Sequence, residues 1–205
     1  MYIVDISEII LYVNNILLVI CLFVGIIKYR SFKNAEKWYV YYIIFLFLIE
    51  TSVKIAIHVF HAKELNHIFP YYVSGELLVL GTLFIRKLNL SAYLYIPLAV
   101  TAGFFLLSND IIVNETKKVI SSIIIICFAG YALLMEISNP KINARFIIAD
   151  SLIFLYYAMS VFMFFVLRQL ADFKMEDANM IWNVNNLLCS LLYVSLIYTF
   201  LKLKK

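Results

Sequence analysis

Charged residues are scarce in this sequence. They make up 15% of its 205 residues, while 64% are hydrophobic. Average soluble domains are roughly 25% charged and 45–50% apolar. A soluble domain with this composition would expose far more apolar surface than such proteins normally do. The shortage of charge therefore excludes an ordinary soluble protein and predicts a membrane protein that contacts the lipid bilayer along most of its length.

Glycine and proline are also rare, with five and three residues respectively. Pro97 alone among the prolines falls in the middle of an apolar segment, and the sequence contains no GxxxG motif. Transporters with interrupted helices usually carry paired Gly and Pro breaks in corresponding halves of the chain. The absence of such pairs favours continuous helices.

Motifs that would supply chemistry are missing as well. Cys21, Cys127 and Cys189 fall in apolar segments without a CxxC or Cys/His pattern, which predicts small buried hydrophobes rather than a disulfide or a metal site. No P-loop, GxSxG or kinase motif occurs. The basic residues are scattered through short connections, which argues against nucleic-acid binding. We expect no cofactor, name no catalytic residue, and regard an enzyme as the less favoured class.

Seven apolar segments are present, and each is close to the roughly 20 residues that a membrane-spanning helix needs. They cover 6–27, 38–60, 68–85, 91–108, 118–138, 146–168 and 179–201. The connections between them are short and carry most of the charge, so no soluble domain remains. The predicted fold is all-α, a single membrane domain over 1–205 that forms a bundle of seven transmembrane helices.

The placement of Lys and Arg predicts the orientation of this bundle. One side of the membrane would carry eleven such residues: Lys28, Arg30, Lys33, Lys37, Arg86, Lys87, Lys141, Arg145, Lys202, Lys204 and Lys205. The other side would carry five: Lys63, Lys117, Lys118, Arg168 and Lys174. By the positive-inside rule, the N-terminus lies outside and the C-terminus lies in the cytoplasm, and we expect a multi-pass protein of the bacterial cytoplasmic (inner) membrane.

Ionisable residues inside these segments define a candidate site. Glu50, Lys54 and His58 lie on one face of a helix, and Glu76 lies at a comparable depth in the next segment. Charges at this depth cost roughly 2.5–3.5 kcal/mol each on insertion scales, so they need a reason. Glu50 and Lys54 can pair at i, i+4, which would leave Glu76 either protonated or sharing Lys54 or His58.

Asn14, Asn183 and Asn186 place amides in the same outer half of the predicted membrane. Three interpretations stay open at this point, and in the third of them these groups carry out a chemical reaction. The first is an outward-facing polar pocket whose ligand-binding residues are Glu50, Lys54, His58, Glu76, Asn14, Asn183 and Asn186. The second is that these groups only join helices through hydrogen bonds, which contribute about 0.6 kcal/mol each.

The His58-x-x-His61 pair puts two imidazoles on one helix face. Catalytic zinc sites need three well-placed protein ligands and an open position, and the HExxH motif is absent. We therefore expect no metal at this pair.

Two stretches carry a resemblance to a known group. They are ELNHIFPYYVSGELLVLGTLFIRKL, and the run from ARFIIADSLIFLYYAMSVFMFF to MIWNVNNLLCSLLYVSLIYTFLKLKK, which together cover about half the chain. They resemble small, largely uncharacterised seven-helix membrane proteins of Bacteroidetes-type bacteria. The resemblance implies a sensor-like inner-membrane protein that works beside a separate signalling protein such as a histidine kinase. It favours Glu76, Asn183 and Asn186 as site residues, whereas the role of Glu50 and Lys54 rests on physical reasoning alone.

The function that we expect is therefore an integral membrane sensor or receptor-like module with an outward-facing polar pocket, signalling through a separate partner. Three alternatives remain: a small proton-coupled transporter, a lipid-active membrane enzyme, and a structural membrane subunit.

Overall fold

The computed structural model describes residues 6–61, 67–108, 113–138, 145–169 and 175–203. These residues form seven α-helices and two short 3-10 helices, and none of them lies in a β-strand. The elements are α1 (Ile6–Lys28), η1 (Tyr29–Ser31), α2 (Lys37–His58), α3 (Phe69–Lys87), η2 (Ala92–Leu94), α4 (Tyr95–Leu107), α5 (Asn114–Ser138), α6 (Ile147–Gln169) and α7 (Met175–Lys202). The predicted all-α class is confirmed, as are all seven helices. The largest differences are at the starts of α4, α5 and α7.

Five helices in the described residues are long and apolar enough to cross a membrane. The qualifying segments are Ser7–Ser31, Lys37–His58, Asn114–Ser138, Ile147–Phe165 and Trp182–Lys202. Large apolar side chains on them are exposed, for example Ile27 at 76%, as is expected where lipid rather than water surrounds a helix. The chain is therefore a multi-pass membrane protein. That α3 and α4 also cross stays a prediction.

The exposure of apolar faces corrects one expectation about the cysteines. Cys21 is buried as predicted, but Cys127 is exposed and Cys189 is half-buried. Hydropathy predicts that a residue lies in a membrane segment. It does not say whether the residue faces protein or lipid, because both environments are apolar.

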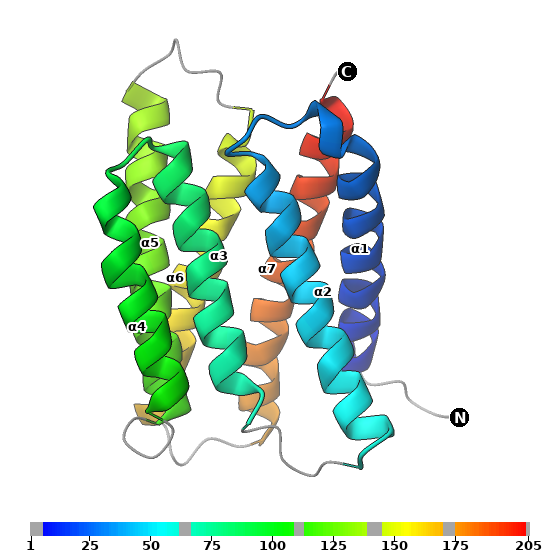
Figure 1. The fold of residues 1–205 in the computed structure, drawn as a ribbon. Helices are drawn as coiled ribbons and strands as arrows, with labels where there is room; N and C mark the ends of the chain where they lie inside the picture. Colours follow the sequence, from blue (N-terminus) through cyan, green and yellow to red (C-terminus); the bar gives the residue numbers. More distant parts are fainter. Residues whose placement is uncertain (1–5, 62–66, 109–112, 139–144, 170–174, 204–205) are drawn as a thin grey trace. The chain divides into compact units, whose positions relative to one another are not determined.

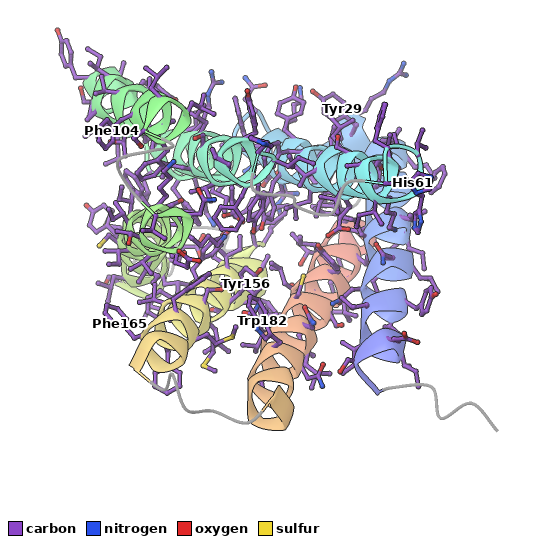
Figure 2. All side chains as sticks on the ribbon, turned by 90° about the horizontal axis from the view of Figure 1, so that it is seen from below. Tyr29, His61, Phe104, Tyr156, Phe165 and Trp182 are labelled. Carbon is purple, nitrogen blue, oxygen red and sulfur yellow. The ribbon has the colours of Figure 1, made fainter. Side chains whose placement is uncertain are left out.

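The chain divides into two compact units, and each has its own row of helices. Unit 1 comprises Met1–Ser31 and Ala129–Lys205, and unit 2 comprises Phe32–Phe128, so α5 contributes to both. In unit 1, α7 packs against both α1 and α6 (Figure 1). In unit 2, α3 packs against both α2 and α4, and Figure 2 shows these three helices as a row with α3 in the middle.

The central position of α3 is seen in its buried residues, which cover more than half of the helix circumference. The consecutive residues Leu83, Phe84 and Ile85 are at most 1% exposed and span about 200° at 100° per residue. A helix that is buried over such a wide arc packs against neighbours on more than one side. Because α3 packs against both α2 and α4, a change in the position of α3 would affect both neighbouring helices.

The C-terminus of α3 is fixed by a Schellman motif. The backbone N–H of Leu90 donates to the Ile85 carbonyl at 2.9 Å, and that of Asn89 donates to the Arg86 carbonyl at 3.3 Å. Asn89 has φ 50°, the left-handed conformation that this motif requires and that asparagine tolerates better than most residues. The turn between α3 and α4 is therefore held by backbone hydrogen bonds.

Candidate functional site

Three polar side chains meet in the interior of unit 2 and form the buried charge cluster, defined as Tyr72, Glu76 and Lys118. The Lys118 ammonium forms an ion pair with Oε2 of Glu76, and the two side chains are 5% and 0% exposed. The Tyr72 hydroxyl donates to Glu76 Oε1 at 2.8 Å and accepts from Lys118 Nζ at 2.9 Å. Lys118 Nζ also lies 4.5 Å from the centre of the Tyr72 ring. Each member of the cluster thus contacts the other two.

The local sequence explains how the cluster forms. Tyr72 and Glu76 are four residues apart on α3, so they lie one above the other on the same face of the helix. Lys118 lies early in α5 and reaches them with its long side chain. A carboxylate buried in an apolar helix is very unfavourable unless a cation and hydrogen-bond donors compensate it. Lys118 and Tyr72 supply both.

The neighbouring Lys117 has no exposed surface either. Its ammonium donates to the backbone carbonyl of Phe105 at 3.0 Å. Phe105 lies in the last turn of α4, where carbonyls lack a partner within the helix and the helix dipole places negative charge. Lys117 therefore compensates the C-terminus of α4 and ties α5 to it.

Two serines extend the polar strip along α5. Ser121 and Ser122 are fully buried, and among the described residues their hydroxyls have no hydrogen-bond partner. They follow Lys117 and Lys118 at a spacing of four, so they lie next to these lysines on the helix surface. Buried hydroxyls are nearly always hydrogen-bonded, and an exception in a native structure calls for an explanation. Apolar side chains could fill these buried positions without the cost of unpaired polar groups. Packing alone therefore does not explain two lysines and two serines in the first turns of α5.

The partner of Glu76 corrects a prediction. Glu76 was expected to be protonated or to share Lys54 or His58, but it pairs with Lys118. The hydropathy pattern places the start of this helix at 118 and counts both lysines among the charges at the membrane surface, so neither is considered as a partner for Glu76. The helix begins at Asn114 and both lysines are buried. Their spacing of four to Ser121 and Ser122 was a signal in the sequence that could have placed them on a helix.

The three predicted site residues of α2 lie elsewhere. Glu50, Lys54 and His58 are all exposed, whereas Glu76 has no exposed surface. The structure therefore does not gather these four described residues around one pocket. Glu50, Lys54 and His58 do lie on one face of α2, as their spacing predicts. That face is exposed and is not buried against other helices.

The predicted asparagines meet in unit 1, at the contact between α1 and α7. Asn14 Nδ2 donates to the backbone carbonyl of Asn186 at 3.1 Å, and the Ser190 hydroxyl donates to Asn14 Oδ1 at 2.5 Å. Nearer the helix ends, Asn183 Nδ2 donates to the Ser7 hydroxyl at 3.1 Å. This arrangement matches the second interpretation, in which polar groups join helices.

Asn14→Ala is expected to lower the free energy of unfolding by about 1 kcal/mol, because two interhelical bonds worth about 0.6 kcal/mol each are lost. The control is Ser52→Ala. The Ser52 hydroxyl is exposed and donates to the Leu48 carbonyl of its own helix at 2.8 Å, so we expect a smaller loss. Denaturant titration in mild detergent measures both. An equal loss in the two variants would remove the special role of Asn14.

Among the described residues, no group of three or more His, Cys, Asp and Glu side chains lies close enough to hold a metal ion. His61, three residues beyond the end of α2 (Figure 2), has φ 49° and is exposed.

Comparison of the chain with protein-family models, with curated proteins and with solved structures finds no match. The resemblance to small seven-helix bacterial membrane proteins therefore stays a prediction.

Proposed function

We propose that this chain is an integral membrane sensor or receptor-like module whose switch is the buried charge cluster. The observation that carries the proposal is the burial of the Glu76–Lys118 ion pair. Ionisable residues in membrane segments are costly, rare and usually functional. If a proton or a small charged ligand neutralises one partner, the other is left as an uncompensated buried charge. The helices must then repack, and this gives two states that the stimulus can bias.

The contacts of the cluster give such a change a route through unit 2. Glu76 and Tyr72 belong to α3, and Lys118 belongs to α5. The adjacent Lys117 holds the end of α4 through Phe105. Movement of the start of α5 would therefore alter contacts with α3 and α4 together.

The proposed placement has seven spans, an outer N-terminus, a cytoplasmic C-terminus and a bacterial cytoplasmic membrane. The burial of Lys117 and Lys118 supports this orientation, because buried lysines no longer count among the charges at the membrane surface. The outer side then keeps three of its five Lys and Arg residues, against eleven on the inner side. The basic inner connections would contact the separate signalling partner, for which a histidine kinase is the proposed type.

The sensor proposal is tested by the distance between α3 and α5. Spin labels at the exposed positions Leu78 and Ile123 report this distance by double electron–electron resonance, with the three native cysteines replaced by alanine. In the protein with the unaltered cluster, we expect one narrow distribution of distances between the two labels, because the ion pair holds α3 and α5 together. Glu76→Gln leaves the Lys118 ammonium as an uncompensated buried charge and should add a second, longer population.

The control is the charge exchange Glu76→Lys/Lys118→Glu, which keeps an ion pair and should restore the single distribution. Lys54→Gln, which removes an exposed cation from α2, should leave it unchanged. The same distribution in all variants would refute the switch. If that result came with proton uptake into proteoliposomes that depends on Glu76, the chain would be a proton-coupled carrier instead.

A further inference from the structure

Unit 2 contains an open pocket of about 430 Å³ that is separate from the buried charge cluster. It is lined by the turn before α2 (Asn34, Ala35), the last turn of α3 (Ile85, Arg86), the turn that follows (Asn89) and the first turn of α4 (Tyr95). All of these segments lie at one end of the α2–α3–α4 row. The volume falls within the range of small-molecule sites, roughly 300–1,000 Å³.

The surroundings of the pocket are strongly cationic. The segments 32–37 and 85–95 contain four cations, Lys33, Lys37, Arg86 and Lys87, and one acid, Glu36. Glu36 Oε2 accepts a hydrogen bond from the backbone N–H of Lys33 at 2.8 Å, so part of its charge is used by the chain itself. A concave surface with this excess of positive charge attracts anions.

Arg86 is held in a position to bind one. Its guanidinium lies 5.3 Å from the centre of the Trp38 ring. A cation–π contact uses none of the N–H donors of the guanidinium, and these donors match two oxygens of a phosphate. Next to it, the Schellman motif fixes the backbone of Asn89, so the amide projects from a rigid turn. The residues that line the pocket therefore include four that can donate hydrogen bonds to phosphate oxygens, Asn34, Arg86, Asn89 and Tyr95.

The level of the pocket relative to the membrane surface indicates the source of the phosphate. Trp38 lies at the start of α2, which is long and apolar enough to span a membrane, and Tyr93 beside the pocket is 81% exposed. Trp and Tyr are enriched at the level of the lipid headgroups. Basic pockets between helices on the cytoplasmic side are a known type of site for anionic headgroups.

We infer that this pocket binds a phosphate group, with Arg86 as the cation and Asn89 as a neutral donor. The ligand is a phosphate-bearing anion, either the headgroup of an anionic phospholipid or a soluble phosphate compound. The site lies at the end of unit 2 that the charge distribution places in the cytoplasm, and it does not depend on the sensor proposal.

The test measures the thermal unfolding midpoint of the full chain in neutral detergent during three titrations. The added compounds are phosphatidylglycerol, phosphatidylcholine with the same acyl chains, and inorganic phosphate at constant ionic strength. A ligand that binds the folded state raises the midpoint with its concentration, which yields an apparent affinity. We expect phosphatidylglycerol to raise the midpoint more than phosphatidylcholine does. In Arg86→Gln its apparent affinity should fall roughly 10- to 100-fold, the range expected for the loss of one hydrogen bond to a charged group.

Two further variants separate binding from folding and from net charge. Asn89→Gly keeps the left-handed turn, since glycine adopts it readily, but removes the amide, and it should weaken binding several-fold. Lys202→Gln removes another helix-end cation that stacks on an aromatic ring, at 4.4 Å from the Tyr198 centroid, and should leave the affinity unchanged.

A response to inorganic phosphate that Arg86→Gln abolishes would assign the site to soluble phosphate compounds. A response to phosphatidylglycerol alone would assign it to a lipid headgroup. The inference is overturned if Arg86→Gln and Asn89→Gly bind both probes as the wild type does. It is also overturned if Lys202→Gln weakens binding equally, or if phosphatidylcholine acts as strongly as phosphatidylglycerol.

Discussion

Glu76→Gln is expected to lower the free energy of unfolding by about 3–5 kcal/mol, the usual cost of removing one partner from a buried ion pair. The amide cannot neutralise Lys118, whose ammonium would remain charged in an apolar interior. Lys118→Met should cost a similar amount, because it leaves the Glu76 carboxylate with only the Tyr72 hydroxyl. Denaturant titration of the purified protein in mild detergent, followed by circular dichroism, measures both changes.

The matched control is Glu50→Gln, the same chemical change at an exposed position of α2. Glu50 lies inside a helix that is apolar enough to span a membrane, so removing its charge should not lower the free energy of unfolding. A loss at Glu50 as large as that at Glu76 would mean that burial does not determine the effect.

The double variant Glu76→Leu/Lys118→Met completes a thermodynamic cycle. Replacing both charges by apolar groups removes the burial cost together with the attraction, so we expect its stability to lie close to that of the wild type. The two single losses would then be strongly non-additive, which is the sign of direct coupling. Simple addition of the losses would show that Glu76 and Lys118 act independently. This measurement reports the energy of the pair, whereas the distance measurement between α3 and α5 reports its role as a switch.

The helices of this protein could be predicted from the sequence because lipid-spanning helices need long apolar runs, and length and hydropathy are local properties. Their ends were less certain. The residues Asn114–Lys117 are polar, so hydropathy assigns them to the loop, yet they form the first turn of α5. That turn is stabilised by tertiary contacts, since Lys117 binds the end of α4. Such a contact cannot be found from a hydropathy pattern.

The candidate site was predicted in part for a related reason. Periodicity correctly grouped Glu50, Lys54 and His58 on one face of α2, but it does not say whether that face turns toward protein or away from it. The position of Glu76 in an apolar segment was informative, because a buried carboxylate requires a partner. Which cation serves as that partner depends on a tertiary contact between residues 42 positions apart, Glu76 on α3 and Lys118 on α5.

The packing of α3 against α4 leads to the second large expected effect, at Gly81. A Cβ atom at this position would lie 2.6 and 2.7 Å from the two methyl carbons of Leu98 on α4. Leu98 is 5% exposed, so its side chain has little room to move. We therefore expect Gly81→Ala to lower the free energy of unfolding by about 1–3 kcal/mol through overpacking.

Gly103, also in unit 2, provides the matched control, because a Cβ atom there would have no neighbour within 4 Å. Gly103→Ala should raise the free energy of unfolding by about 0.5–1 kcal/mol, since alanine favours an α-helix over glycine by this amount. The same substitution thus has opposite expected signs on α3 and α4, and denaturant titration in detergent distinguishes them. If the loss at Gly81 comes from the clash, Gly81→Ala/Leu98→Ala should be more stable than the sum of the two single losses predicts. Additive losses would mean that the close approach of α3 and α4 at Gly81 is not what the glycine is needed for.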